Sequence, residues 1–146
     1  MNVRDRWVFL ALVLTQAVHS VEEYIFRLYE VFAPARFACS LFNDDPATGF
    51  IISNSALVLF GLGCYVFAVG PGHRSSRVWV WIWIIIQLIN GIGHTVIALA
   101  QGGYFPGVAT APLLIGLALY LLVKVSGIFP PRAKRRSDNA QAGASQ

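Results

Sequence analysis

Long apolar runs separated by short polar connections dominate this chain. Each run is close to the roughly 20 residues that a helix needs to cross a bilayer. The runs lie at about residues 7–28, 51–69, 78–100 and 108–125. Turn-forming and polar stretches separate them, namely NDDPATG, GPGHRSSR and QGGYFPG. The pattern predicts an all-α, polytopic membrane protein, a four-transmembrane-helix bundle over residues 1–129. Residues 130–146 are polar and basic, and we expect them to form a disordered cytoplasmic tail.

The composition supports a membrane protein. Hydrophobic residues make up 56% of the chain and charged residues 12%, about half the charged share of an average soluble domain. The net charge of +4 could suggest nucleic acid, but most basic residues flank the apolar runs, where they set topology. We therefore expect the lipid bilayer, and no nucleic acid, as a partner. Cys39 and Cys64 lie at different expected depths, which predicts two free thiols.

The distribution of basic residues predicts the orientation of the bundle. Four spans place both termini and the connection at residues 70–77 on one side of the membrane. On that side lie Arg4, Arg6, Arg74, Arg77, Lys124, Arg132, Lys134, Arg135 and Arg136. The opposite side has Arg27 and Arg36, which three acidic residues offset. The positive-inside rule therefore predicts cytoplasmic N- and C-termini, in the plasma or inner membrane if the protein is bacterial.

The N-terminus has an alternative interpretation as a cleaved signal peptide. The basic stretch MNVRDR precedes an apolar run that ends near Val18, His19 and Ser20, where small residues could mark a cleavage site. Cleavage there would remove His19 and leave three spans. Because apolar residues resume beyond the glutamates in YIFRLYEVF, we favour an uncleaved first helix.

Polar side chains interrupt the first and third apolar runs at matching depths. Counted from the start of the first run, His19 lies about 18 Å deep, and Glu22 and Glu23 lie about 22–24 Å deep. On the third run, Asn90 lies about 18 Å deep and His94 about 24 Å deep. At about 100° per residue, both glutamates flank the face of His19, while Asn90 and His94 share a face. Since such groups are costly in lipid, they predict a functional polar pocket toward the outer leaflet.

Three motifs follow one another along the chain: HSVEE at 19–23, NGIGH at 90–94 and YFPGVAT at 104–110. In these motifs the chain resembles the HXXEE-domain family of small integral membrane proteins, which is marked by His-x-x-Glu-Glu, Asn-x-x-x-His and Tyr-x-Pro-Gly-x-x-Thr. The resemblance implies a membrane protein suspected to be an enzyme, and it supplies no substrate. The motif positions that it implies are His19, Glu22, Glu23, Asn90, His94, Tyr104, Pro106, Gly107 and Thr110.

Two histidines and a carboxylate in polar stripes of matching depth predict a metal centre. His19, His94 and either Glu22 or Glu23 would hold one ion, a catalytic zinc with an open position or a non-haem iron. The other glutamate would act as a general base toward a water molecule that the metal acidifies. A di-iron site is less favoured, because such bundles use four carboxylates and these spans offer two.

Further motif residues would complete the site around such a metal. Asn90 would orient a ligand or the substrate, and Tyr104 would donate a proton or cap the pocket. Pro106, Gly107 and Thr110 belong to an irregular connection that we expect to line the pocket as a lid. The expected function is metal-assisted hydrolysis of a lipid-like substrate, a hydrophobic small molecule.

Two other functions stay open at this point. A metal-free enzyme such as an isomerase would shuttle protons through His19 and the glutamates. A proton- or metal-coupled transporter would also need such polar residues. The cytoplasmic halves of the first and third runs, VFLALVL and VWVWIWIII, are apolar throughout, which argues against transport by a monomer. A homo-oligomer could still form a path.

Several nearby residues have structural interpretations. Arg27 lies four residues beyond Glu23 and could pair with it on one helix. We expect the tryptophans of the third run, Trp83 among them, to face lipid or form an interfacial belt. Gly91 and Gly93 are expected to permit close helix packing.

Overall fold

The computed structural model describes residues 1–127, and every regular element in this range is helical. The all-α prediction is therefore confirmed. The elements are α1 (Val3–Ile25), α2 (Leu28–Val31), α3 (Ala33–Ser40), α4 (Pro46–Cys64), the π-helical turn η1 (Tyr65–Val69), α5 (Ser76–Gln101) and α6 (Ala111–Ser126). The tail expected at residues 130–146 lies outside the described residues.

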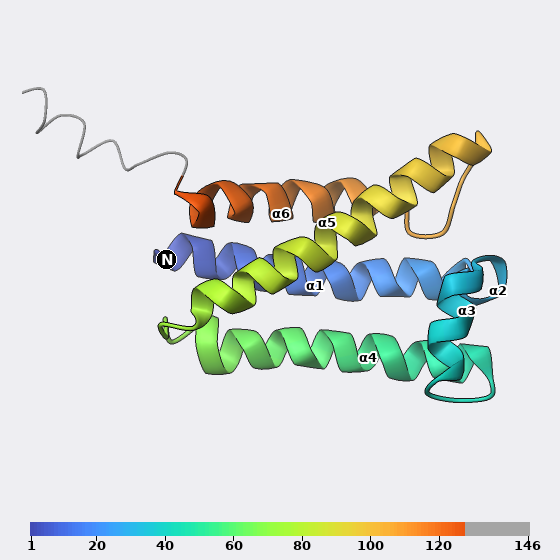
Figure 1. Ribbon diagram of the computed structural model, residues 1–146, viewed down its shortest axis with the longest axis horizontal. Helices are drawn as coiled ribbons and strands as arrows, with labels where there is room; N and C mark the ends of the chain where they lie inside the picture. Colours follow the sequence, from blue (N-terminus) through green and yellow to red (C-terminus); the bar gives the residue numbers. More distant parts are fainter. Residues whose placement is uncertain (128–146) are drawn as a thin grey trace, which may run out of the picture.

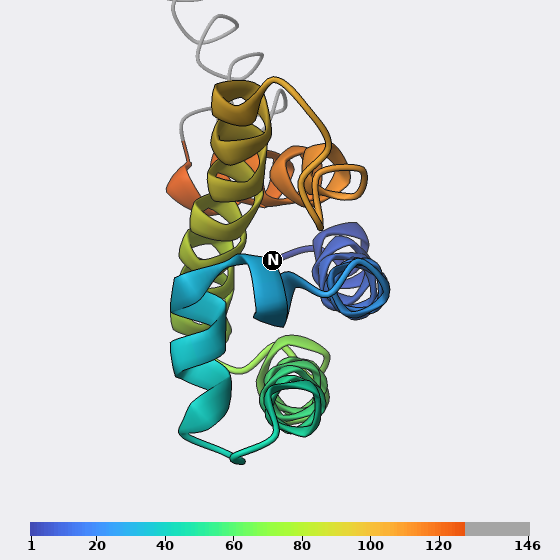
Figure 2. The same cartoon turned by 90° about the vertical axis from the view of Figure 1, so that its right-hand side faces the viewer.

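α1 is the central helix of the bundle. It lies between α4 and α6 in one layer, and α5 crosses the face of this layer obliquely (Figures 1 and 2). The short helices α2 and α3 turn across the end of the bundle where α1 finishes, and the loop from α5 to α6 returns at the same end (Figure 1). We call this end, with α2, α3 and residues 102–110, the motif end. The opposite end, with Asn2 and Ser126, is the terminal end.

The local sequence explains where the helices begin and end. Asn2 caps α1 through reciprocal hydrogen bonds with Asp5, and the Asp45 side chain caps α4 by accepting a backbone hydrogen bond. α1 ends at Ile25, three residues earlier than expected. Arg27 adopts a left-handed backbone with φ 55°, and this turn leads the chain into α2.

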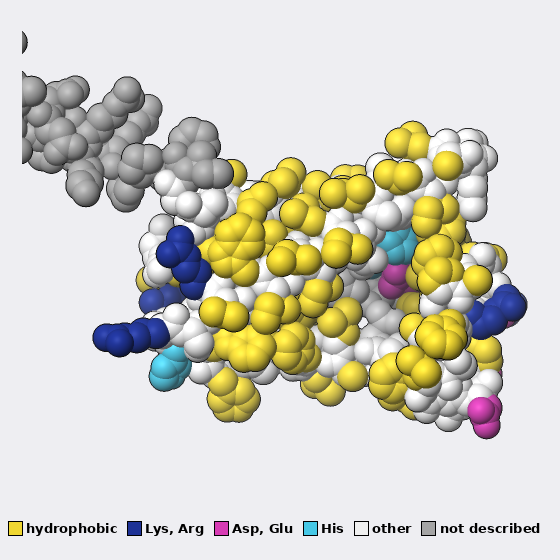
Figure 3. Space-filling model, viewed as in Figure 1, with side chains coloured by type: hydrophobic (Ala, Val, Ile, Leu, Met, Phe, Trp, Pro, Cys, Tyr) yellow, Lys and Arg dark blue, Asp and Glu magenta, His cyan; other side chains and the backbone are white. Residues whose placement is uncertain are grey.

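Within residues 1–127, three helical segments are long and apolar enough to cross a membrane, and a shorter apolar helix accompanies them. The long segments are α1, the continuous segment Pro46–Val69 and α5, while α6 has 16 residues. Hydrophobic side chains cover the side of the bundle, and on this face most of the basic side chains gather at the terminal end (Figure 3). These features indicate a membrane helical bundle, and the fourth span stays a prediction.

Two apolar clusters fill the bundle. The larger one occupies the half toward the terminal end and includes Phe9, Leu12 and Trp83. The expectation that Trp83 faces lipid is wrong, because its side chain is 0% exposed and its ring packs directly against Gly61 of α4. A smaller cluster joins α2, α3, α4 and the α5–α6 loop at the motif end. The two cysteines are both free, as predicted.

Only one of the two glycines in the NGIGH motif allows close packing between helices. A Cβ atom at Gly91 would lie 2.7 Å from Cγ1 of Ile115 and 3.1 Å from the carbonyl oxygen of Ala111. Gly91 therefore allows α6 to pack tightly against α5. A Cβ atom at Gly93 would meet nothing within 4 Å among the described residues, so the packing prediction is wrong for Gly93.

Candidate metal centre

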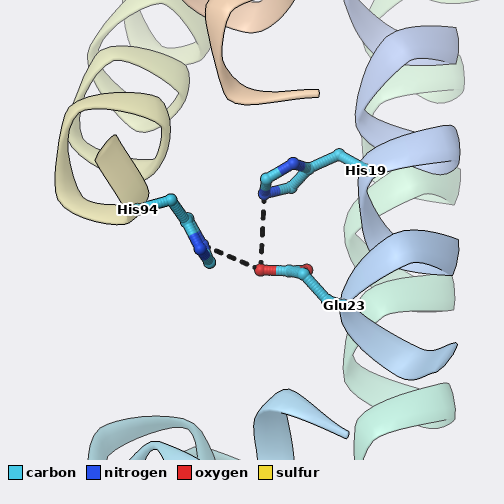
Figure 4. Close-up of side chains that lie close together, drawn as sticks. All are labelled: His19, Glu23 and His94. Carbon is cyan, nitrogen blue, oxygen red and sulfur yellow. Dashed lines mark ion pairs between the residues drawn. The ribbon is translucent and has the colours of Figure 1, made fainter. Parts of the chain in front are cut away.

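His19, Glu23 and His94 meet inside the bundle near the motif end (Figure 4). Oε1 of Glu23 lies 3.0 Å from Nε2 of His94 and 3.4 Å from Nε2 of His19. All three side chains are buried, and His19 is 0% exposed. The sequence left open which glutamate joins the two histidines, and in the structure it is Glu23.

Helix geometry explains how these side chains meet. His19 and Glu23 are four residues apart and therefore lie on one face of α1. Asn90 and His94 have the same spacing on α5, and Oδ1 of Asn90 lies 3.0 Å from Nε2 of His94. The polar stripes of α1 and α5 therefore face each other, as their matched depths predict.

The second ring nitrogen of His19 is held by a relay that begins at Glu22. The hydroxyl of Thr110 donates to Oε2 of Glu22 at 2.6 Å, because an ionised carboxylate can only accept. Oγ1 of Thr110 lies 2.6 Å from Nδ1 of His19. Since the hydroxyl proton is already engaged, Nδ1–H of His19 donates to Thr110. A neutral His19 then turns the lone pair of Nε2 toward Glu23.

The second ring nitrogen of His94 is held by the α5–α6 loop. Nδ1 lies 2.5 Å from the carbonyl oxygen of Pro106, which can only accept, so Nδ1 carries a proton. Gly107 follows with φ 91°, a conformation that favours glycine. A Cβ atom there would lie 2.7 Å from Cε1 of His19 and 2.7 Å from Nδ1 of His94. The Pro-Gly pair of the motif therefore fits closely against both imidazoles.

Glu22 lies beside this cluster and holds the α5–α6 loop. Its carboxylate accepts hydrogen bonds from the backbone N–H groups of Gly107, Ala109 and Thr110 at 3.0–3.1 Å. It also accepts from the hydroxyl of Tyr104 at 2.5 Å. With so many donors engaged, Glu22 anchors the loop and reaches His19 only through Thr110.

Tyr104 is half exposed, and its hydroxyl contacts the Glu22 carboxylate. Burial of its hydroxyl and the hydrogen bond to the Glu22 carboxylate raise the pKa of Tyr104. The phenol is therefore held in its protonated, donating form. This contact makes Tyr104 part of the loop anchor.

A chain of hydrogen bonds that the sequence did not predict links the site to α4. Nδ2 of Asn90 donates to Oε1 of Gln16 at 3.4 Å, and Nε2 of Gln16 donates to Oγ of Ser20 at 3.1 Å. Ser20 in turn donates to Oδ1 of Asn54 at 2.8 Å. Gln16 is 1% exposed, so these contacts satisfy a fully buried amide. The sequence held a signal for this residue, because Gln16 lies three residues before His19 and therefore shares its face of α1.

The pair between Arg27 and Glu23, which the sequence allowed as an alternative role for Glu23, does not form. Arg27 lies beyond the end of α1, where the chain turns, and its guanidinium contacts Glu30 at 3.4 Å on the surface. No arginine or lysine among residues 1–127 forms an ion pair with Glu23, whose recorded partners are the two histidines.

Two of the three separations among the converging atoms match the spacing of metal ligands. Two ligands bound at 2.0–2.1 Å with tetrahedral angles lie about 3.3 Å apart. The observed separations from Glu23 are 3.4 Å and 3.0 Å, and all three ligand atoms lie within 4.8 Å of one another. Two histidines and one carboxylate form a donor set found at catalytic zinc and at non-haem ferrous iron.

A cleft of about 480 Å³ opens beside the cluster. Its polar floor consists of Gln16, Glu23, Asn90 and His94, and its walls come from α2, α3, α4 and α5. Acidic and histidine atoms are visible in a hollow on the side of the bundle, bordered by hydrophobic side chains (Figure 3). Substrate could reach the cluster through this opening.

Comparison with known proteins identifies one family. The family model described as "Protein of unknown function with HXXEE motif" matches residues 7–121, which include every motif residue discussed above. No curated protein matches the chain, and no solved structure matches it.

Proposed function

The chain belongs to the family of proteins of unknown function with an HXXEE motif, and we propose that it is a membrane-embedded metalloenzyme that hydrolyses a lipid-like substrate. In this proposal His19, Glu23 and His94 hold one zinc or ferrous ion. The N- and C-termini face the cytoplasm, so the motif end belongs to the outer leaflet.

One observation carries the proposal: Nε2 of both histidines converges on Oε1 of Glu23, while partners outside the cluster engage both Nδ1 atoms. The Thr110 hydroxyl and the Pro106 carbonyl are such partners, and metal-bound histidines commonly donate their other N–H to groups of this kind. A lone pair on Nε2 of His19 faces a carboxylate oxygen 3.4 Å away. Two electron-rich atoms at that distance repel each other unless a metal ion or a proton lies between them, and in this proposal the metal ion takes that place.

The donor set also supports the choice of chemistry. An ion held by two histidines and one carboxylate keeps a position open, from which it polarises a carbonyl group or activates water. Asn90 lies against His94 at the floor of the cleft and would orient the substrate. Glu22 would act through Thr110 on His19, and Tyr104 and Gly107 would hold the lid in place.

Elemental analysis of the detergent-purified full chain tests this proposal. We expect about one zinc or iron ion per chain after loading with either metal. The variants His19→Ala, His94→Ala and Glu23→Gln should lose it, whereas His73→Ala, an exposed histidine at the terminal end, should retain it. A wild type without stoichiometric metal, or equal metal content in all four variants, would remove the proposed centre.

A metal-free acid–base enzyme such as an isomerase is the second candidate, and the surroundings of His94 favour it. Nδ1 faces the Pro106 carbonyl, and Nε2 lies 3.0 Å from Oδ1 of Asn90 and 3.0 Å from Oε1 of Glu23. A doubly protonated imidazole would donate to these acceptors and could pass a proton to Glu23. ¹⁵N NMR of histidine-labelled wild type that shows both nitrogens of His94 protonated after metal loading would favour this candidate.

A coupled transporter has less support. Between the site and the terminal end, the bundle is filled by the large apolar cluster, in which Phe9, Trp83 and Leu121 are each 0% exposed. Such packing supports a site that opens on one side, since a transport path needs polar groups on both sides.

A further inference from the structure

The cleft beside the metal centre opens toward the side of the bundle. α5 supplies Ile86 and Ile89 to one wall, and α4 supplies Leu57 to the other. Ile89 is 71% exposed, so the mouth of the cleft lies on the apolar surface that a membrane helix turns toward lipid. A molecule dissolved in the bilayer can therefore reach the polar floor without crossing an aqueous phase.

The motif end of the cleft is closed by α2 and α3. Phe32, Ala35 and Ala38 line the cleft there, and they separate it from the surface beyond α3. The opposite end continues along α5 from His94 to Ile86, a distance of about 12 Å for eight residues of helix. The free direction of the cleft therefore runs from the metal centre toward the middle of the bilayer.

The depth of the site fits the carbonyl region of a lipid. α5 has 26 residues, a length of about 39 Å, which exceeds the roughly 30 Å hydrocarbon core of a bilayer. If the excess is shared between both ends, each end of α5 extends about 5 Å beyond the core. His94 lies seven residues before Gln101, or about 10 Å from the helix end, and thus about 5 Å inside the boundary. Acyl carbonyls lie close to that boundary, with their chains directed inward.

We propose that the cleft binds one acyl chain of a lipid from the leaflet at the motif end, with the ester or amide carbonyl at His19, Glu23 and His94. This inference rests on the metal-dependent function proposed above and names its substrate class. The chain lies between Ile86 and Leu57, and the head group lies toward the interface beside α3. Because lipid tails are as apolar as the walls, selection depends on the polar floor.

The reaction balances without any oxidant or reductant. The oxygen of one water molecule bonds to the acyl carbon, and the bond from that carbon to the ester oxygen or amide nitrogen breaks. One proton of the water passes to the leaving oxygen or nitrogen. The products are a fatty acid and an alcohol or amine, and the fatty acid can leave by the same side opening.

Photolabelling in vesicles tests the position of the acyl chain. The full chain is reconstituted in phosphatidylcholine that carries a diazirine in the middle of one acyl chain, irradiated and mapped by mass spectrometry. We expect strong labelling of Leu57, which is only partly exposed. Ile86→Trp should reduce this labelling several-fold by filling the cleft. Ile85→Trp is the matched control, because Ile85 is 52% exposed and lies outside the cleft lining.

The outcomes separate this inference from the proposed function. Labelling of Leu57 that is equal in both tryptophan variants, or label concentrated in the groove of about 550 Å³ between α1 and α4, would overturn the cleft assignment. The reciprocal variant Leu57→Trp, read out at Ile86, repeats the test should Ile86→Trp fold poorly. Metal content measured on the same samples reports on the metal centre independently, and Ile86→Trp should retain the ion.

Discussion

The relay from Glu22 through Thr110 to His19 can be broken without touching a proposed metal ligand. Thr110→Val keeps the shape of the side chain and removes its hydroxyl. In the wild type, Oγ1 of Thr110 lies 2.6 Å from Nδ1 of His19. The variant loses this acceptor for Nδ1–H, and it also loses one donor to the Glu22 carboxylate. The backbone N–H of Thr110 still donates to Glu22, so the loop keeps most of its anchor.

The cost of this change falls mainly on the metal-bound form. When a metal occupies Nε2, His19 must keep its proton on Nδ1, and this buried donor then has no partner, at a cost of about 1–3 kcal/mol. Without metal, the proton can move to Nε2 and face Oε1 of Glu23, 3.4 Å away. The difference corresponds to a loss of metal affinity of about 10- to 100-fold, the range typical for removal of an outer partner of a metal-bound histidine.

Zinc competition against a chromophoric chelator measures this affinity in detergent. We expect Thr110→Val to bind one ion with a Kd raised about 10- to 100-fold, and Thr110→Ser to restore the wild-type Kd. Thr95→Val is the matched control, because the Thr95 hydroxyl only donates to the Gly91 carbonyl of its own helix. Wild-type affinity in Thr110→Val, or an equal loss in Thr95→Val, would refute the relay.

Three further predictions concern packing and the loop. Gly91→Ala should lower the free energy of unfolding by about 1–3 kcal/mol through overpacking against Ile115. Gly93→Ala, in open space, should leave the free energy of unfolding unchanged or raise it by up to about 1 kcal/mol. Thermal unfolding in detergent that shows no difference between the two variants would contradict the packing account. Because the pKa of Tyr104 is raised in the folded protein, its contact with Glu22 contributes fully to stability below pH 10.0, and this stability is lost as pH rises through the higher folded pKa. A difference absorbance titration against Tyr104→Phe checks this. A phenolate signal from Tyr104 at pH 10 would contradict it. Glu22→Gln should speed chymotrypsin cleavage in the α5–α6 loop, since it removes a charged acceptor shared by several donors, and an unchanged cleavage rate would argue against the anchor.

The meeting of α1 and α5 side chains could be predicted because helix geometry is regular. A fixed rise and rotation per residue put Asn90 level with His19 and His94 level with Glu23, and placed them on definite faces. The apolar runs likewise predicted the all-α architecture. Their ends were less predictable: α6 begins at Ala111 rather than near residue 108, because residues 102–110 form the loop that lies against the histidines.

Periodicity could not predict which glutamate contacts the two histidines and which one anchors the α5–α6 loop. Glu22 and Glu23 are adjacent, so both flank the face of His19, and the choice depends on where the α5–α6 loop passes. That path depends on the Pro106 carbonyl and on the positive φ of Gly107, which no helical pattern encodes. Once the loop lies over Glu22, only Glu23 remains free to face His94.

The hydrophobic pattern also could not predict the structure of the chain between α1 and α4. A non-glycine residue with φ 55° is uncommon, so nothing marked Arg27 as the point where α1 ends. The alternative pair of Arg27 with Glu23 required a continuous helix, so it does not form. α3 was missed as well, although Pro34 at its first turn is a usual helix-start signal.

X-ray absorption at the metal edge of the loaded, full-length protein tests the central claim most directly. Coordination by His19, Glu23 and His94 predicts two imidazole nitrogens and carboxylate or water oxygens at about 2.0–2.2 Å, with no sulfur. Scattering from sulfur at about 2.3 Å would assign the metal to cysteine, and a spectrum without imidazole would contradict the proposed centre.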